Sequence, residues 1–173
     1  LALVNVKQLD VLEQLACRLL NSGLHGSRRN GIINQNRDIA GGCLELGQRM
    51  IQLLRLDLPA GTSISYGRTF ISDKPIRTAV ITAGYADGHP RRISNASYDM
   101  IHGKKFKQVG RICMDMHMID VTGDDSVKVG DEVTLWGGAG MTAEEVGKVV
   151  GTINYELTCL ITPRVPRVYI NED

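Results

Sequence analysis

The stretch Arg77-Thr-Ala-Val-Ile-Thr82 is rich in β-branched side chains, and it runs into Gly84-Tyr-Ala-Asp-Gly88, which contains a tight-turn signal. β-Branched residues favour strands, and Asp-Gly pairs favour turns. Similar short runs separated by Gly, Asp or Pro occur at residues 64–66, 108–113, 118–122, 132–136 and 165–170. Strands this short and this frequent predict a mainly β domain, built as a barrel or a sandwich.

One helix is expected within this β-rich region. Thr142-Ala-Glu-Glu145 has a Thr and a Glu three residues apart, which is the pattern of a capping box. The predicted helix continues to about Val150 and ends at Gly151.

The first 43 residues differ in composition from the β-rich region. Residues 5–20 carry apolar side chains at three- and four-residue steps, which predicts an amphipathic helix. Residues 22–43 are rich in Gly, Asn and Arg, a composition typical of a loop or linker. We therefore expect a helical and linker extension over 1–43 and a β-domain over 44–173.

Composition excludes several classes of function. The 173 residues include 20 basic and 19 acidic side chains, so no basic stripe indicates a nucleic-acid partner. No apolar run reaches the roughly 18 residues of a membrane helix, and the chain does not open with a signal-peptide pattern. The sequence predicts neither a nucleic-acid nor a membrane partner.

Cysteines and histidines show no metal-binding spacing. The four cysteines contain no CxxC pair, which argues against a zinc site or a disulfide framework and favours the reducing cytoplasm. His89, His102 and His117 also lack ligand spacing, so we expect them to be surface or locally bonded residues and predict no metal.

Three tyrosines lie in polar or turn-like contexts with arginines nearby: Tyr66, Tyr85 and Tyr155, with Arg68, Arg91 and Arg111. A phenol can donate or accept a hydrogen bond, and it can exchange a proton when a cation lowers its pKa from about 10. The alternative is that each ring packs and its hydroxyl meets water. The arginines favour a polar site.

Four segments carry a resemblance to a known family. They are residues 61–69 (GTSISYGRT), 84–92 (GYADGHPRR), 110–116 (GRICMDM) and 151–156 (GTINYE), the last followed by PRVPR at 163–167. In this order they resemble the C-terminal β-domain of alanine racemase, a pyridoxal-phosphate (PLP) isomerase that interconverts L- and D-alanine. The resemblance covers residues 44–170 and implies a cytoplasmic enzyme of D-alanine biosynthesis, which supplies peptidoglycan precursors.

The resemblance also implies residue roles. Tyr66 corresponds to the catalytic tyrosine that removes or returns the α-proton on one face of the substrate. Tyr85 corresponds to the tyrosine that narrows the substrate entrance. Met114 corresponds to the residue whose backbone N–H holds the substrate carboxylate. Tyr155 corresponds to the tyrosine that hydrogen-bonds the PLP phosphate and lines the entrance.

Around the entrance, the resemblance implies a corridor formed by Arg91, Arg111 and Ile153. Two arginines there would attract an anionic or zwitterionic amino acid. An alternative prediction places the side chain of Met114 in the hydrophobic core. Cys113 is predicted to be a small buried hydrophobic residue. In the PRVPR run the arginines are expected to face polar groups of the domain or, alternatively, to pair with a partner domain.

One half of the family's site has no counterpart in this sequence. The family attaches PLP to a lysine of an N-terminal α/β barrel, and none of the seven lysines here has that sequence setting. Lys104, Lys105 and Lys107 are expected in a hydrophilic turn, charged and exposed. The implied arrangement is a homodimer in which the β-domain of one chain completes the barrel site of the other.

Two alternatives remain open at the level of sequence. The domain could be a non-catalytic partner or dimerisation module related to racemases. It could also belong to a serine-type racemase, because much of the contact with the substrate side chain would come from the barrel, which this sequence lacks.

Overall fold

The computed structural model describes residues 31–34, 45–48, 50–137 and 140–165, with side chains from residue 56 onward. The predicted helix over residues 5–20, most of the 22–43 linker and the predicted strand over 166–170 lie outside the described residues. Among those residues, no helix combines the length and the apolar character needed to cross a bilayer.

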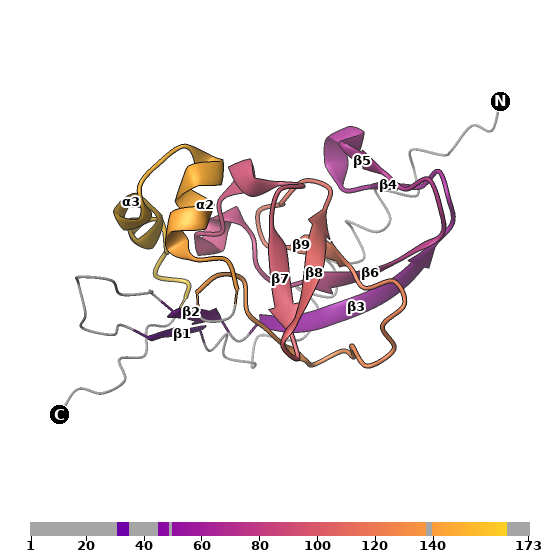
Figure 1. Ribbon diagram of the computed structural model, residues 1–173, viewed down its shortest axis with the longest axis horizontal. Coiled ribbons are helices and arrows are strands. Elements are labelled where there is room, and N and C mark those ends of the chain that lie inside the picture. Colours follow the sequence, from indigo (N-terminus) through magenta and orange to yellow (C-terminus); the bar gives the residue numbers. More distant parts are fainter. Residues whose placement is uncertain (1–30, 35–44, 49, 138–139, 166–173) are drawn as a thin grey trace.

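A six-stranded antiparallel sheet forms the body of the domain (Figure 1). Its order is β10-β3-β6-β9-β8-β7. The bounds are Met50–Leu58 (β3), Ile76–Ile81 (β6), Tyr98–Ile101 (β7), Lys104–Val109 (β8), His117–Asp120 (β9) and Glu132–Val133 (β10).

The two edges of this sheet meet. Thr134 directly follows β10 and exchanges two backbone hydrogen bonds with Met100 of β7, at 2.8 and 2.9 Å. The chain segment that carries one edge strand therefore pairs with the other edge strand. Closure of a sheet removes its unpaired edges. Of the two architectures predicted from the sequence, barrel and sandwich, the structure therefore has the barrel.

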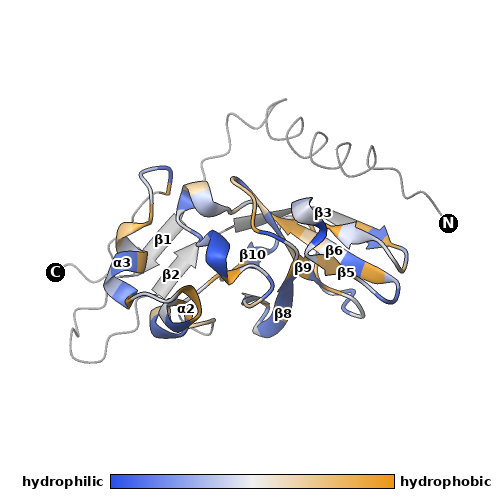
Figure 2. Cartoon of the chain, turned by 90° about the horizontal axis from the view of Figure 1, so that it is seen from above, coloured by the Kyte–Doolittle hydropathy of each residue, from blue (hydrophilic) through white to orange (hydrophobic). Residues whose placement is uncertain are grey.

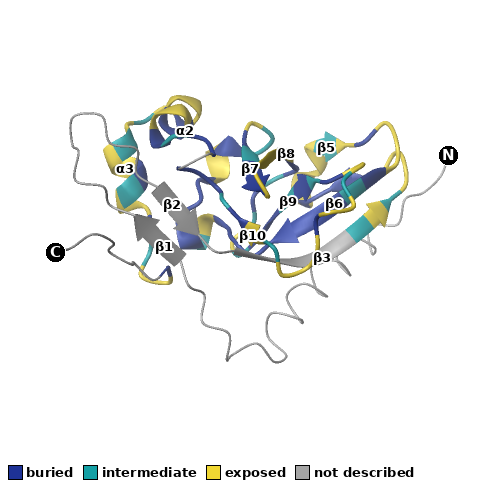
Figure 3. Ribbon diagram, turned by 60° about the horizontal axis from the view of Figure 1, so that its bottom comes forward, coloured by how far each residue is buried: buried dark blue, intermediate teal, exposed yellow. Residues whose placement is uncertain are grey.

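Strand alternation separates the inside of the barrel from the outside. Ala79, Ile81, Ile101 and Ile119 are at most 1 % exposed and belong to one apolar core. Side chains two residues apart on a strand share a face, so Asp99 of β7 and His117 of β9, which are also buried, point inward with Ile101 and Ile119. Burial is highest on the strands that pass through the middle of the domain, such as β6 (Figure 3).

Two helices lie side by side at one end of the domain, α2 (Ala143–Val150) and α3 (Asn154–Cys159) (Figure 1). Val146, Val150 and Leu157 join the same core as the barrel strands. Helix α2 has both hydrophobic and hydrophilic residues around its axis (Figure 2). Its capping box is present as predicted: Thr142 Oγ1 accepts from Glu145 N, and Thr142 N donates to Glu145.

The remaining elements are short. The hairpin β1 (Gly31–Asn34) with β2 (Glu45–Gln48) and the hairpin β4 (Ser63–Ile64) with β5 (Phe70–Ile71) form two-stranded sheets. Three 3-10 turns, η1 (Tyr66–Arg68), η2 (Tyr85–Asp87) and η3 (Arg91–Ile93), carry three of the seven predicted site residues, Tyr66, Tyr85 and Arg91.

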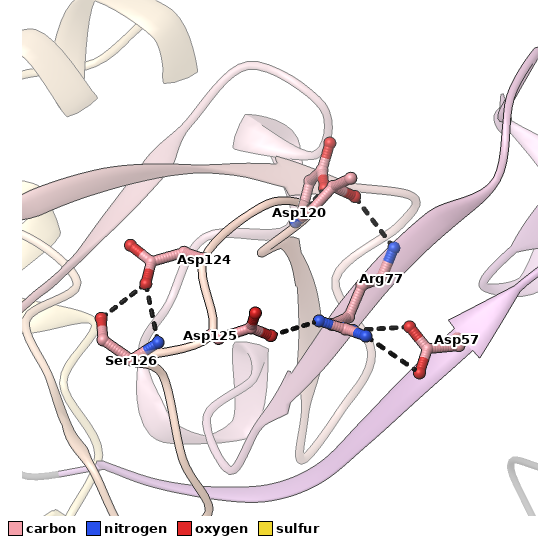
Figure 4. A network of polar contacts seen from close by, with 7 residues as sticks. Asp57, Arg77, Asp120, Asp124, Asp125 and Ser126 are labelled. Carbon is pink, nitrogen blue, oxygen red and sulfur yellow. Dashed lines mark hydrogen bonds and ion pairs between the residues drawn. The ribbon is translucent and has the colours of Figure 1, made fainter.

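An exposed ion-pair network ties β3 and β6 to the loop after β9 (Figure 4). Arg77 donates to Asp57 at 2.5 Å and to Asp125 at 2.7 Å, and its backbone N–H donates to Thr122 Oγ1 at 2.9 Å. The pKa of Arg77 is raised by its hydrogen bond to Asp57. Exposed ion pairs contribute little to stability, so the network fixes the loop's geometry more than it stabilises the barrel.

Most predicted strands are present, and two expectations are corrected. Lys104, Lys105 and Lys107 belong to strand β8, not to a turn; the turn is His102-Gly103, and the lysines are exposed as expected. Figure 2 shows β8 as a largely hydrophilic strand. The segment 154–159 forms a helix that was not predicted, because six residues give too little periodicity to identify one.

The capping box of α2 should be a measurable part of the domain's stability. Thr142→Ala removes the acceptor for Glu145 N, and loss of such a cap costs about 1 kcal/mol. We expect urea denaturation to show this decrease in the free energy of unfolding. Glu144→Gln, in the same helical turn but outside the box, is the matched control; an equal loss in both variants would contradict the capping role.

Candidate active site

Two loops at one end of the barrel are joined by backbone hydrogen bonds. Tyr85 N donates to the carbonyl of Cys113 at 3.1 Å, and Ala86 N donates to the carbonyl of Met114 at 2.9 Å. A Cβ on Gly84 would lie 2.3 Å from both carbonyl oxygens. The absence of a side chain at Gly84 is therefore what allows the two loops to meet.

Charged side chains lock the same two loops. Asp87 is fully buried, and its Oδ2 accepts from Gly84 N at 3.0 Å. Arg164 donates to Asp115 at 2.6 Å and lies 3.6 Å from Asp87 Oδ1, so it connects both loops to the segment after α3. This arginine of the PRVPR run thus pairs within its own domain, and its pKa is raised by the hydrogen bond to Asp115.

Tyr66 lies next to this loop pair. It follows Ser65, a non-glycine residue with φ of 62°, whose hydroxyl donates to the carbonyl of Arg111 at 2.8 Å. Positive φ is unfavourable for residues with a side chain and often marks functional sites. The result is a half-exposed phenol, 37 % accessible, at the surface of the loop pair.

Two arginines flank the Tyr66 phenol. Arg91 Nε donates to Tyr66 Oη at 2.5 Å, and its guanidinium lies 5.4 Å from the ring centroid. The guanidinium of Arg111 lies 5.9 Å from the same centroid. Tyr66 Oη in turn donates to the carbonyl of Ile112 at 3.4 Å. The hydrogen bond to Tyr66 raises the pKa of Arg91, so this arginine stays a cation beside the phenol oxygen.

Met114 is exposed rather than part of the core. Its side chain is 53 % accessible, which excludes the alternative reading of a core methionine. Its carbonyl is used by Ala86, but its backbone N–H has no hydrogen-bond partner among the residues that the structure describes. Cys113, expected as a small buried hydrophobe, is only partly buried, and it packs against Val80 and Met116.

Tyr85 and Arg91 share a cavity of about 410 Å³ with α2 and α3. Its wall also includes Arg92, Thr152 and Glu156. Tyr85 is 45 % exposed at this edge. The lining of the cavity therefore carries both signs of charge.

Tyr155 and Ile153 lie at the start of α3 and are 62 % and 65 % exposed. Within the described part of the chain, no hydrogen bond, ion pair or ring contact connects either residue to Tyr66. The structure brings together five of the seven predicted site residues: Tyr66, Tyr85, Arg91, Arg111 and Met114. Ile153 and Tyr155 lie outside this group, at the exposed start of α3.

Directly beneath these loops lies a buried polar cluster that the sequence did not predict. His117 and His89 are 0 % and 1 % exposed, so the expectation of surface residues is wrong for both, while His117 is bonded within the domain as the other alternative allowed. His117 Nδ1 lies 2.7 Å from the carbonyl of Ala83, and its Nε2 lies 2.6 Å from Asp99 Oδ2. Sequence spacing missed the cluster because its members come from β7, β9 and the loop after η2.

The two buried imidazoles have opposite electrostatic environments. Desolvation alone would lower the pKa of His117, but the Asp99 carboxylate and the Ala83 carbonyl outweigh it and raise that pKa. Desolvation and the neighbouring His117 hold the pKa of His89 well below its usual range. His117 is therefore the charged partner of Asp99, and His89 is neutral.

Comparisons with known proteins identify the family. Residues 44–169 match the family described as "Alanine racemase, C-terminal domain". The alanine racemase of Laribacter hongkongensis is 45 % identical over 129 residues, which are 71 % of this chain and 36 % of that protein. The alanine racemase of Methanococcus maripaludis is 48 % identical over 118 residues, which are 66 % of this chain and 31 % of that protein.

Solved structures agree with this match. Alanine racemase from Streptomyces coelicolor A3(2) has a TM-score of 0.67 at 35 % identity, covering 75 % of this chain and 34 % of that one. Alanine racemase from Bartonella henselae with covalently bound pyridoxal phosphate has a TM-score of 0.65 at 34 % identity, covering 69 % and 33 %. The β-barrel and its polar loop pair thus define an amino-acid racemase C-terminal domain. The chain belongs to the alanine racemase C-terminal domain family, and it spans about a third of the length of the curated relatives it matches.

The close approach at Gly84 predicts a sharp sensitivity to substitution. Gly84→Ala should lower the free energy of unfolding by about 3 kcal/mol, because the added methyl would lie 2.3 Å from two backbone carbonyl oxygens and would force the loops apart. Gly103→Ala is the control: it has φ of 74° and open space, and it should cost only about 1 kcal/mol of backbone strain. Equal losses in urea denaturation would contradict a steric role for Gly84.

Proposed function

We propose that this domain supplies the tyrosine half of an alanine racemase site, in which an α/β barrel carries the PLP. The observation that carries the proposal is the hydrogen bond from Arg91 Nε to Tyr66 Oη, together with the second guanidinium of Arg111 near the ring. A proton-transferring phenol must be stabilised when it is ionised, and adjacent cations do this. Tyr66 would take or return the α-proton at its phenolic oxygen.

Substrate positioning is assigned to the neighbouring loop. The backbone N–H of Met114, which has no hydrogen-bond partner among the described residues, is suited to donate to a substrate carboxylate, since a backbone N–H donor binds anions without a side-chain charge. Tyr85 narrows the entrance, and Arg91, Arg111 and Ile153 form its corridor. The arginines raise the local concentration of a zwitterionic amino acid.

The residues of this chain fit the outer side of a PLP site but not its covalent anchor. Tyr155 presents an exposed phenol at the rim, available to donate to the cofactor phosphate. Every described lysine is exposed, whereas an amine that forms a Schiff base is activated by desolvation or a nearby cation. When bound, PLP supplies the electron sink that acidifies the α-proton; the barrel would hold it.

Exposed apolar side chains support the presence of a covering partner. Nine large hydrophobic residues are exposed in the part of the chain that the structure describes, and six belong to the site segments or to the wall of the cavity. These six are Tyr66, Tyr85, Met114, Ile153, Tyr155 and Leu160. A cluster of this kind marks an interaction surface, and the barrel of a second subunit in a homodimer is the occupant we propose.

The test uses a chimera in which residues 44–173 replace the matching segment of the Laribacter hongkongensis alanine racemase. We expect the chimera to convert L- to D-alanine and Tyr66→Phe to reduce kcat at least about 100-fold, the scale of general acid–base catalysis. PLP content should be unchanged. Tyr98→Phe, on β7 away from the loop pair, is the matched control.

Two results would contradict the assignment. An active chimera whose Tyr66→Phe variant keeps full turnover would remove the catalytic role. A folded, PLP-loaded chimera with no activity on alanine would favour the non-catalytic module, and activity on serine instead of alanine would favour the serine-type alternative.

Tyr155→Phe should separate cofactor binding from catalysis. Loss of one hydrogen bond to the phosphate should weaken PLP retention in the chimera by about 10-fold, equivalent to roughly 1.4 kcal/mol. Dialysis followed by absorbance of the remaining PLP measures this. An unchanged PLP affinity would show that Tyr155 does not hold the phosphate.

A further inference from the structure

Three metal-ligating side chains meet inside the closed end of the barrel. His89, Asp99 and His117 are each at most 1 % exposed, and one possible ligand atom from each lies within 4.8 Å of the others. Asp99 and His117 have the same parity as the inward-facing Ile101 and Ile119 on their strands, so they point into the barrel. The cluster is separate from the Tyr66 loop pair and has no role in the proposed proton transfer.

The cluster contains polar atoms with no partner. Both ring nitrogens of His89 and Oδ1 of Asp99 are fully buried and form no hydrogen bond. Buried polar groups are nearly always satisfied, because an unpaired one costs free energy. The neutral imidazole of His89 and the unpaired oxygen of Asp99 could both be satisfied by a ligand bound between them.

The orientation of His117 is that of a metal ligand. Its Nδ1 lies 2.7 Å from the Ala83 carbonyl, which can only accept a hydrogen bond, so this nitrogen carries a proton. Metal-binding histidines usually donate one ring N–H to a carbonyl or carboxylate and ligate through the other nitrogen. The other nitrogen, Nε2, faces Asp99.

The spacing of the rings also fits a shared ion. The centroids of His89 and His117 are 4.8 Å apart, with the ring planes inclined at 31°. With Zn–N bonds of about 2.0 Å, a ring radius of about 1.1 Å and a tetrahedral angle, two imidazoles on one zinc have centroids about 5 Å apart. The observed separation of the ring centroids is therefore close to that of two imidazoles on one zinc.

We propose that His89, Asp99 and His117 form a closed, structural site for one Zn²⁺ ion. Two imidazoles and a carboxylate form a ligand set that suits zinc and cobalt better than calcium or magnesium. Ser97, two residues before Asp99, also has a buried hydroxyl without a partner. It is available to hold a water in the fourth coordination position.

Metal binding exchanges a proton for an ion. The proton shared by His117 Nε2 and Asp99 Oδ2 leaves to solvent, and both atoms become ligands of the metal. Their separation widens from 2.6 Å to about 3.3 Å, the ligand spacing of a tetrahedral zinc. One positive charge is added to the interior, and the buried Asp87 carboxylate is a nearby negative group whose field already acts on His117.

The site would brace the loops above it. His117 begins β9, Asp99 is on β7, and the Ala83 carbonyl that His117 contacts directly precedes the Tyr85 loop. A metal would join these three elements at the end of the barrel. Because the ion is enclosed, it would enter during folding, when metal binding contributes to stability.

The first experiment titrates the untagged full chain with Co²⁺ after refolding from a chelator-treated denatured state. We expect one Co²⁺ per chain, with visible d–d bands of tetrahedral intensity and no thiolate charge-transfer band. X-ray absorption at the zinc edge of the Zn²⁺-loaded chain should show two imidazoles with oxygen and no sulfur. Failure to bind either ion, or sulfur in the first shell, would overturn the proposal.

Variants then locate the site. His89→Leu should weaken Co²⁺ affinity by more than about 100-fold, beyond what loss of an outer-sphere partner costs. His102→Gln and His25→Gln, which change the chain's other two histidines, should leave affinity unchanged. Unaltered binding in His89→Leu, or lost binding in either control, would overturn the assignment; if His89→Leu does not fold, the absorption spectrum of the unmodified chain decides alone.

Discussion

Backbone pairing between the Gly84–Gly88 turn and the Cys113–Met114 loop is the constraint on which the site depends. Two hydrogen bonds of 3.1 and 2.9 Å hold the loops together, and only a residue without Cβ fits at Gly84. The barrel brings these loops to one end, since they follow β6 and precede β9, which are neighbours in the sheet. Tyr66 then rests on the pair through Ile112 and the two arginines.

Buried polar side chains at the end of the barrel beneath the loop pair connect the barrel strands to the loops around Tyr66. Apolar residues fill most of the interior, but beneath the loops the interior contains His89, Asp99 and His117. A buried polar network is costly unless satisfied, and a satisfied one specifies a single arrangement. The same carbonyl that orients His117 belongs to Ala83, one residue before the turn that carries Tyr85. A ligand or proton held there would therefore act on the position of the loop that carries Tyr85.

The sequence predicted those features that depend on local patterns. The strand at 77–82, the capping box at Thr142 and the polar setting of Tyr66 each have a short-range signal, and the structure contains them. Helix α3 is too short for periodicity to identify. The His89–Asp99–His117 cluster arises from three distant segments, and barrel closure through Thr134 depends on a pairing that no spacing encodes. Both are consequences of tertiary structure.

We propose that Tyr66 handles the α-proton on one face of the substrate, opposite a base on the barrel. The most direct measurement is exchange of the α-hydrogen of each alanine enantiomer with deuterated solvent, using the chimera and its Tyr66→Phe variant. We expect the substitution to abolish exchange from one enantiomer and to spare it from the other, because only one face loses its base. Equal loss of exchange from both enantiomers, or loss from neither, would contradict it.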